Sequence, residues 1–294
     1  METVPIPRSA VTVSRIGLGT WAIGGWMWGG TDEALSIATI RSAVERGITL
    51  IDTAPVYGFG RSEEIVGKAL AEGGLRSQVA IATKVGIDWP PGGGQPFRNA
   101  SRQRIFNEVE DSLQRLQTDV IDIYQVHWRD PETPIAETAE AMRDLHAQGK
   151  IKAIGVSNYS AKQMETFASI APLHVAPPPF NLFERDIEGD VLPFCRAHDV
   201  ATLTYGALCR GLLSGKMTAI PRSLATICAA WTRNFNSRVS AITSPRSRAS
   251  TALPKARSIS GSFILPCVGF WTSLASARAC GAPAVPNNST RSVM

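Results

Sequence analysis

Four ionisable side chains stand at or just beyond the ends of short apolar runs, and their types could carry out proton transfer. Asp52 ends "ITLID", Lys84 ends "VAIATK" and His127 ends "VIDIYQVH", while Tyr57 follows Asp52 by five residues. An acid, an ammonium, an imidazole and a phenol can together supply a proton to a reacting oxygen and stabilise the charge that develops there. Each residue alone also has a structural explanation, as a turn former, a solvated strand end or a core histidine. Three successive apolar runs that end in Asp, Lys and His nevertheless favour a proton-transfer site.

The elements that must position these side chains follow a regular alternation along the first 216 residues. We predict strands at 15–22, 48–54, 79–86, 120–128, 151–158, 172–180 and 200–208. We predict helices at 31–47, 62–74, 101–117, 134–148, 160–170 and 187–198. Nearly all-apolar strands separated by amphipathic helices indicate a parallel sheet. Seven such units without a dinucleotide fingerprint favour an α/β protein with a (β/α)8 TIM barrel over a doubly wound sheet.

In a parallel barrel the carboxyl ends of all strands lie on one face, whatever their distance in sequence. Asp52, Lys84 and His127 are therefore expected to converge there, together with Ser157 and Asn158, which follow the fifth predicted strand. "GLGTWAIG" carries only a G-x-G, and "GLLSGKM" lacks the spacing of a phosphate-binding P-loop, so neither supports a nucleotide-binding fold of another kind.

At this point the sequence resembles a known family, the aldo-keto reductases, over roughly residues 10–216. The motifs that carry the resemblance are "GLGTWAIGG", "IDTAPVYGFGRSEEIVGKAL", "IATKVG", "IDIYQVHW", "IKAIGVSNYS", "NLFERDIEGDVLPFC" and "TYGALCRGLLSGK". The resemblance implies that Asp52, Tyr57, Lys84 and His127 form the family's catalytic tetrad. It also implies an NAD(P)H-dependent oxidoreductase that reduces an aldehyde or ketone to an alcohol.

The residue types fit that chemistry. Tyrosine has an unperturbed pKa near 10, and the ammonium of Lys84 should lower the pKa of Tyr57 so that it can act as the general acid. Asp52 would keep Lys84 charged and in place, and His127 could donate to the carbonyl oxygen and orient it. We therefore expect the hydride to come from a nicotinamide and the proton to come from Tyr57.

The resemblance also implies a cofactor site, for which we expect NADPH (NADP+). Family members place the nicotinamide carboxamide on a Ser-Asn pair, here Ser157 and Asn158, and stack an aromatic ring, here Phe180, on the nicotinamide. Pro177 stands where the family carries Gln, and "GALCRGLLSGK" matches the loop that closes over the pyrophosphate. The residues expected to contact the cofactor are Gly19, Thr20, Trp21, Asp52, Ser157, Asn158, Phe180, Gly206, Leu208, Gly211, Leu212, Ser214 and Lys216.

Three tryptophans that follow strand ends, Trp21, Trp89 and Trp128, could wall an apolar pocket for the carbonyl substrate, with ordinary packing as the alternative. The five cysteines form no CxxC pair and show no metal spacing, so we expect no metal and a reduced, cytoplasmic protein. "METVPIPRSA" has no basic segment followed by an apolar run, so no signal peptide is expected. The expected partner is a small carbonyl compound, and the sequence does not indicate an oligomeric state.

The net charge of +5 would favour nucleic-acid binding if it were spread along the chain. Residues 1–216 instead hold 21 basic and 25 acidic residues, while residues 217–294 hold nine basic residues and no acidic one. The tail alone makes the protein basic, so we expect neither a nucleic-acid partner nor a membrane. The uncharged stretch 258–277 has the length of a membrane span, but its Ser, Gly and Pro content argues against one.

The acid-free composition of residues 217–294 indicates a reading frame that shifts near residues 217–220. Read one frame away, "LASARACGAPAVPNNS" can encode "GIGARLWGARRPEQL", which regains an acid and resembles the family's segment that grips the adenosine phosphate. We therefore predict two regions: a partial barrel at 1–216, incomplete after its seventh strand, and an out-of-frame, poorly ordered tail at 217–294. Two alternatives to an active reductase remain open, namely an inactive product of a frameshifted gene and a cofactor-binding regulatory module.

Overall fold

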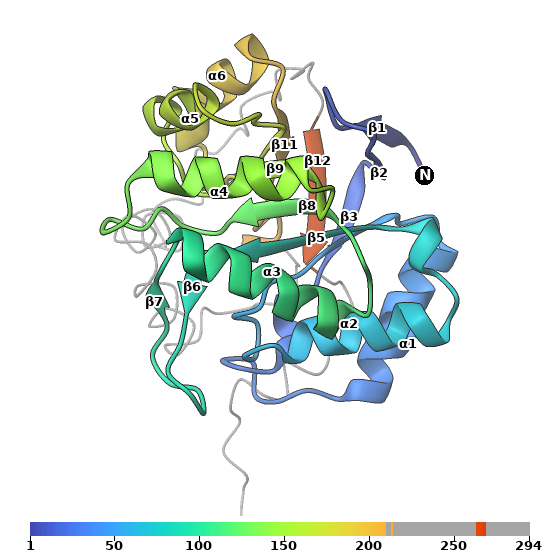
Figure 1. The fold of residues 1–294 in the computed structure, drawn as a ribbon. Helices are drawn as coiled ribbons and strands as arrows, with labels where there is room; N and C mark the ends of the chain where they lie inside the picture. Colours follow the sequence, from blue (N-terminus) through green and yellow to red (C-terminus); the bar gives the residue numbers. More distant parts are fainter. Residues whose placement is uncertain (210–212, 214–262, 269–294) are drawn as a thin grey trace, which may run out of the picture.

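Eight parallel strands form a closed barrel at the centre of the protein (Figure 1). The structure is a computed structural model, and it describes residues 1–209, 213 and 263–268. The barrel strands are β3 (Ile16–Gly19), β4 (Leu50–Asp52), β5 (Ala80–Val85), β8 (Ile121–Val126), β9 (Ile151–Val156), β10 (Val175–Ala176), β11 (Ala201–Leu203) and β12 (Phe263–Val268). They pair in the order β10-β11-β12-β3-β4-β5-β8-β9, with β10 returning to β9.

The helices lie on the outside of the barrel (Figure 1). They are α1 (Glu33–Glu45), α2 (Arg61–Glu72), α3 (Arg102–Leu116), α4 (Ile135–Ala147), α5 (Ala161–Ala168) and α6 (Val191–Ala197). In the described part of the chain, the short 3-10 helices η1 (Trp21–Gly24), η2 (Arg76–Gln78) and η3 (Asp186–Glu188) lie in the connections. Side chains cap several helix starts: Asp32 accepts the backbone N–H of Leu35, and Ser160 forms a reciprocal capping box with Gln163.

Two hydrophobic cores follow from the alternation of side chains along each strand. One core fills the barrel, and its members are Val4, Ile6, Val11, Val13, Leu50, Ala80, Ala82, Ile123, Ala153, Val175, Ala201 and Leu203. The first four come from the N-terminal hairpin of β1 (Thr3–Pro5) and β2 (Thr12–Ser14), which precedes β3 directly. This hairpin closes the end of the barrel at which the strands begin.

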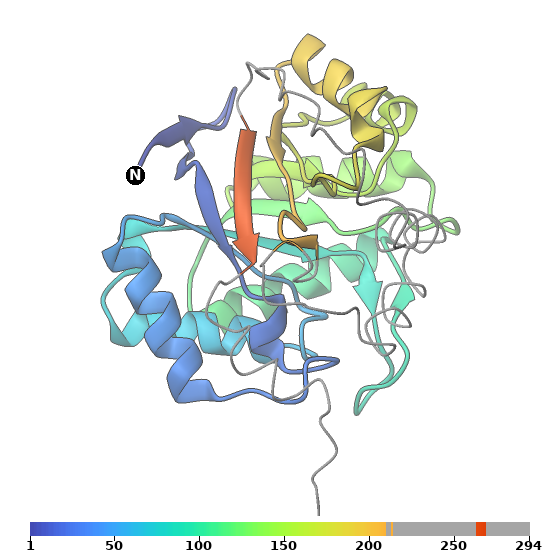
Figure 2. The same ribbon diagram turned by 180° about the vertical axis from the view of Figure 1, so that it is seen from behind.

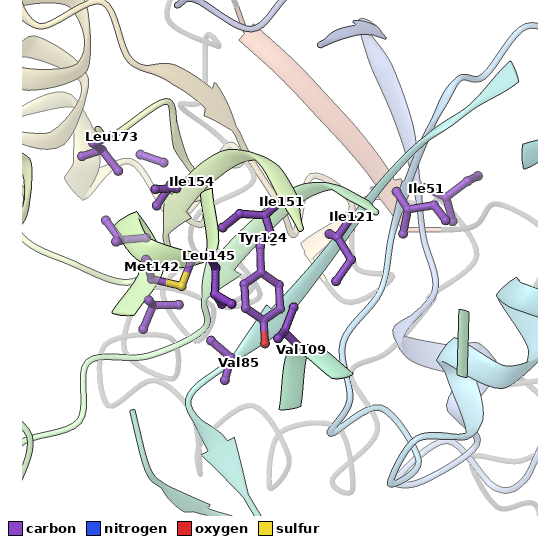
Figure 3. Close-up of a cluster of buried hydrophobic side chains, with 14 of the residues drawn as sticks. Ile51, Val85, Val109, Ile121, Tyr124, Met142, Leu145, Ile151, Ile154 and Leu173 are labelled. Carbon is purple, nitrogen blue, oxygen red and sulfur yellow. The ribbon is translucent and has the colours of Figure 1, made fainter. Parts of the chain in front are cut away.

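The larger core lies between the outer faces of the strands and the helices. Figure 3 shows part of it around Tyr124 of β8, whose ring lies close to Val109 of α3 and Leu145 of α4. The hydroxyl of Tyr124 is buried without a hydrogen-bond partner among the described residues, and burial raises its pKa well above the usual value. Tyr124 therefore acts as a packing residue.

The structure confirms the (β/α)8 class and differs from the predicted elements in several places. The strand predicted at 172–180 is short, because Pro177, Pro178 and Pro179 have no N–H to donate to a neighbouring strand. The helix predicted at 187–198 is divided into η3 and α6, with Gly189 and the capping Asp190 between them. A further hairpin, β6 (Ile87–Asp88) with β7 (Phe97–Arg98), follows β5 and was not predicted.

A further difference concerns the eighth strand. We predicted a barrel that is incomplete after its seventh strand, but β12 lies between β11 and β3 and pairs with both (Figure 2). Strands of a parallel barrel need no alternation of polar and apolar residues, so the missing periodicity in "FILPCV" did not exclude a strand. The other residues of the predicted tail, 217–262 and 269–294, lie outside the described part of the chain.

No helix in the described ranges is long and apolar enough to cross a lipid bilayer.

Candidate active site

Four side chains meet at the end of the barrel where the strands terminate. Asp52 is the last residue of β4, and Lys84 lies in β5 with its Nζ 2.8 Å from Oδ2 of Asp52. The same Nζ donates to the carbonyl oxygen of Thr53 at 2.7 Å and lies 3.3 Å from the hydroxyl of Tyr57. His127 follows β8 directly, and its ring meets the ring of Tyr57 edge-on with centroids 5.9 Å apart.

Burial and charge set the ionisation of this group. Burial by itself lowers the pKa of Lys84, but the attraction of Asp52 and Tyr57 outweighs it, so the pKa is raised and the side chain stays an ammonium. Burial and the charge of Lys84 hold the pKa of His127 well below its usual value, so its imidazole is neutral. A neutral imidazole retains one N–H that can donate to an oxygen.

The pKa of Tyr57 corrects one sequence-based expectation. We expected Lys84 to give this phenol a pKa below 10. The ammonium does lower it, but desolvation by the surrounding protein is the larger effect, and Asp52 adds to it, so the pKa is raised. Tyr57 is therefore protonated at neutral pH, the state from which it can donate a proton.

A close backbone crossing fixes the loop that carries Tyr57. Gly24 of η1 lies against this loop so tightly that a Cβ on it would be 2.3 Å from the carbonyl oxygen of Tyr57. In the reverse direction, a Cβ on Gly58 would be 2.0 Å from the carbonyl oxygen of Gly24. Gly58 also has φ +71°, a region that favours glycine. A side chain at either position would clash with the other backbone, so the approach requires glycine at both 24 and 58.

Buried hydroxyls tie the same loop to the ends of β3 and β4. Ser62 at the start of α2 lies 2.8 Å from the hydroxyl of Thr20 and accepts from the hydroxyl of Thr53 at 3.0 Å. The backbone N–H of Ser62 donates to the carbonyl oxygen of Tyr57. These contacts hold Tyr57 between two strand ends.

The predicted Ser-Asn pair lies beside the tetrad. Ser157 donates to the carbonyl oxygen of Pro177 at 2.9 Å, and the amide of Asn158 donates to the carbonyl oxygen of His127 at 2.9 Å. Tyr205 donates its hydroxyl to Oδ1 of Asn158 at 2.8 Å. Sequence analysis missed Tyr205, although it lies two residues after β11 on the same barrel face, within the quoted "TYGAL".

These groups fit the carboxamide of a nicotinamide. Both N–H groups of the Asn158 amide are used, since the second donates to Oγ of Ser157 at 3.0 Å. Oδ1 of Asn158 has accepted one hydrogen bond and Oγ of Ser157 has also accepted one, which leaves each oxygen with a lone pair. Each of these oxygens can therefore accept one hydrogen bond from an external donor, such as the –NH₂ group of a carboxamide.

Of the other expected cofactor residues, Gly19 ends β3, and Thr20 and Trp21 follow it at the same face. The backbone N–H of Phe180 donates to the carbonyl oxygen of Tyr205, and its ring packs against the outer core. Gly206 and Leu208 follow Tyr205 in the loop after β11. Four expected residues lie outside the described part of the chain: Gly211, Leu212, Ser214 and Lys216.

The three tryptophans expected in the substrate pocket have different surroundings. Trp21 lies beside Tyr57, with ring centroids 6.2 Å apart, and is met edge-on by Trp28 at 5.2 Å. Trp89 contacts the ring of Phe59, with centroids 5.6 Å apart. Trp128 lies under the guanidinium of Arg98. Trp21 thus makes a ring contact with the tetrad.

In the described ranges no three His, Cys, Asp or Glu side chains are grouped so that they could hold a metal ion.

Comparisons with known proteins bear on this site. The sequence model of the "Aldo/keto reductase family" matches residues 15–251. "Aldo-keto reductase YhdN" from Bacillus subtilis (strain 168) is 62% identical over 218 residues, which is 74% of this chain and 65% of that protein, slightly less than two thirds of its length. "NADH-specific methylglyoxal reductase" from Escherichia coli (strain K12) is 41% identical over 231 residues, 74% of this chain and 71% of that protein. A solved glycerol dehydrogenase from Gluconobacter oxydans is similar at TM-score 0.73 and 49% identity, over 82% of this chain and 75% of that one.

Proposed function

The chain belongs to the aldo-keto reductase family, and from this premise we propose that it reduces an aldehyde or a ketone to an alcohol with a nicotinamide cofactor. The observation that carries the proposal is the geometry at Lys84. Its ammonium lies 2.8 Å from Asp52 and 3.3 Å from the hydroxyl of Tyr57, at the strand-end mouth of the barrel. A charged donor beside a protonated phenol is what reduction of a carbonyl requires, because negative charge develops on the oxygen.

Each side chain has a separate task in the proposed reaction. Tyr57 gives its proton to the carbonyl oxygen, and Lys84 stabilises the phenolate that this leaves behind. Asp52 stabilises the ammonium form of Lys84. His127, which is neutral, can donate an N–H to the same carbonyl oxygen and so fix the face that the substrate presents. When bound, the nicotinamide supplies the hydride.

Ser157 and Asn158 would hold the carboxamide of the nicotinamide through their remaining lone pairs. Phe180, and the loop from Gly206 to Lys216, would hold the ring and the pyrophosphate. We propose NADPH as the cofactor, on the basis of the shifted-frame segment "GARRPEQL" and the resemblance. Because the name of the Escherichia coli relative includes NADH, both nicotinamides have to be tested.

The proposed substrate is a small carbonyl compound, with Trp21 beside the phenol and Trp89 and Trp128 in the loops that follow β6 and β8. We propose a cytoplasmic location, supported by the odd number of cysteines and by the buried thiol of Cys195, which forms no disulfide.

Replacing Tyr57 tests the proposed function. The change Tyr57→Phe removes the proton donor and keeps the ring, so kcat for small aldehydes should fall by about 100-fold or more. The assay follows the loss of near-ultraviolet absorbance of NADPH, and separately of NADH. Tyr124→Phe is the matched control, because it removes a buried hydroxyl that bonds to none of the described residues. A Tyr57→Phe protein with full reductase activity would show that Tyr57 is not the acid.

A second candidate function, an inactive product of a frameshifted reductase gene, is favoured by one specific observation. All 25 acidic residues fall within 1–216, and the match to the Bacillus subtilis relative covers a similar length, 218 residues. Under this proposal residues 1–216 are the family barrel and 217–294 are an out-of-frame tail.

The coding DNA and a frame-restored protein distinguish the two candidates. An inactive product should neither bind NADPH nor melt at a higher temperature in its presence, whereas the restored chain should do both. Independent clones that keep the present frame, together with turnover by this chain, would refute the frameshift. Binding of NADPH without turnover of any carbonyl would instead favour a regulatory module.

A further inference from the structure

A glutamine that sequence analysis did not select lies inside the barrel directly beside the tetrad. Gln125 of β8 has no solvent exposure, and its Nε2 donates to Oδ1 of Asp52 at 3.3 Å. The other carboxylate oxygen of Asp52, Oδ2, faces Lys84 at 2.8 Å. The strand register explains the placement, because Gln125 pairs with Lys84 of β5 on one side and with Gly155 of β9 on the other.

The orientation of this amide follows from charge. If the two ends of the amide were exchanged, the carbonyl oxygen of Gln125 would face the carboxylate of Asp52, which is repulsive. In the orientation observed, Oε1 is buried and accepts no hydrogen bond from the described residues. An unpaired buried oxygen costs stability, so Gln125 is a poor choice for packing alone. The hydrogen bond from the amide to Asp52 is therefore the interaction that accounts for glutamine at this position.

The neighbouring strand leaves room for this side chain. A Cβ on Gly155 would lie 3.0 Å from Cγ of Gln125 and 3.2 Å from the carbonyl oxygen of Val175. A larger residue at 155 would push Gln125 out of its contact with Asp52 or push β10 outward. Glycine at this position leaves space for the Cγ of Gln125.

We propose that Gln125 is a positioning residue of the proton-transfer site, whose amide holds one oxygen of Asp52 and thereby turns the other oxygen toward Lys84. The proposal rests on the proposed reductase function for its effect on catalysis. Among the described residues, the side chain of Gln125 donates its hydrogen bond to Asp52 and not to Tyr57, so we infer that it acts through Asp52.

The direction of its effect follows from the charges already described. Asp52 raises the pKa of Lys84 and raises the pKa of Tyr57. If Asp52 loses its amide donor and is held less firmly, both pKa values should fall. Carbonyl reduction needs Tyr57 and Lys84 in their protonated forms, so activity is lost as pH rises through these pKa values. Loss of Gln125 should therefore move the alkaline limb of the kcat profile to lower pH.

The test replaces Gln125 with methionine, which has a similar length and no amide. In Gln125→Met we expect kcat to fall by about tenfold, since one hydrogen bond to a charged group is removed. We expect KM for the carbonyl to stay unchanged and the alkaline limb of kcat to move down by roughly half a unit. Gln125→Asn, which keeps the amide but shortens the side chain, should lie between the wild type and Gln125→Met.

A cofactor-free measurement makes the test independent of turnover. The ultraviolet titration of Tyr57, obtained by subtracting the titration of Tyr57→Phe, should show a lower pKa in Gln125→Met than in the wild type. Thermal unfolding should show no loss of stability in Gln125→Met, because the variant also removes the unpaired Oε1. Ile123→Val, two residues away on the same barrel-facing side of β8, is the control and should change neither titration nor kcat profile.

The outcomes separate this inference from the proposed function. A folded Gln125→Met protein with wild-type kcat, pH profile and Tyr57 titration would overturn the positioning role. The role would also be overturned if stability fell while the pH profile and titration stayed the same, since that result is the signature of packing. A wild-type chain without reductase activity but with the expected change in titration would refute the proposed function and support the positioning of Asp52.

Discussion

Adding a single methyl group at Gly24 should displace Tyr57 from its site. In Gly24→Ala the new Cβ would lie 2.3 Å from the carbonyl oxygen of Tyr57, 2.4 Å from its carbonyl carbon and 2.8 Å from the backbone nitrogen of Gly58. All three atoms belong to the main chain, so no side chain can rotate away. The loop that carries the phenol has to withdraw as a unit.

The size of this movement follows from the same contacts. Ordinary contacts begin near 3.4 Å, so the loop must retreat by roughly 1 Å from a contact at 2.3 Å. The hydroxyl of Tyr57 is already 3.3 Å from Nζ of Lys84, and a further retreat of that size breaks the contact. A displacement of about 1 Å at a reacting group can cost about 100-fold in rate. Overpacking of this kind also destabilises a protein by about 1–3 kcal/mol.

The assay for Gly24→Ala combines kcat for a small aldehyde at saturating cofactor with urea unfolding. Gly189→Ala is the matched control, because its Cβ would meet nothing closer than the carbonyl oxygen of Asp186 at 3.6 Å. We expect the control to keep the wild-type kcat and stability, and Gly24→Ala to lose both. A Gly24→Ala protein that is folded and turns over at the wild-type rate would refute the claim that the glycine crossing positions Tyr57.

Two further changes test other parts of the description. Lys84→Met leaves the carboxylate of Asp52 without its buried cation. The free energy of unfolding in urea should therefore fall by about 3 kcal/mol, and carbonyl reduction should be lost. An unchanged free energy of unfolding would show that the Asp52–Lys84 pair is not desolvated. His174 accepts the backbone N–H of Ile154 on Nδ1, and burial lowers its pKa to about 4. The stability linked to the neutral form of His174 is therefore complete above its usual pKa of 6.5 and is lost as pH falls toward 4. Measured between pH 7 and about pH 4, the Tm of His174→Gln should fall less steeply than the Tm of the wild type. Equal slopes of Tm against pH would contradict this.

The barrel could be predicted from the sequence because its strands are short, nearly all apolar and separated by helices with clear starts. The predicted strand at 79–86 became β5 (Ala80–Val85), and the predicted helix at 101–117 became α3 (Arg102–Leu116), begun by the capping Ser101. The predicted ends of strands were wrong where local residue chemistry outweighs the hydrophobic pattern. Three successive prolines shorten β10, and the helical turn η1 follows the short β3 where a longer strand was predicted.

The candidate site was accessible to sequence reasoning only in part. Asp52, Lys84 and His127 lie at or next to the carboxyl ends of their strands, so the topology alone predicts that they meet. Gln125 lies inside a strand among apolar residues, and nothing in the one-dimensional pattern indicates that it faces Asp52. The net direction of the pKa of Tyr57 also required the structure, because it depends on how much burial opposes the charge of Lys84.

The pairing of β12 with β3 has a consequence for the timing of biosynthesis. It joins Leu265 to Ile16, so the first barrel strand to leave the ribosome waits for the last one. The roughly 250 residues between them take about 12 to 50 seconds to synthesise at typical rates. During that interval β3 presents an unpaired edge to other nascent chains and to chaperones, and β11 does so over roughly the last 60 residues before β12 is made. A chain released before residue 263 keeps both edges open and is therefore exposed to edge-to-edge aggregation, whether or not its active-site residues are in place.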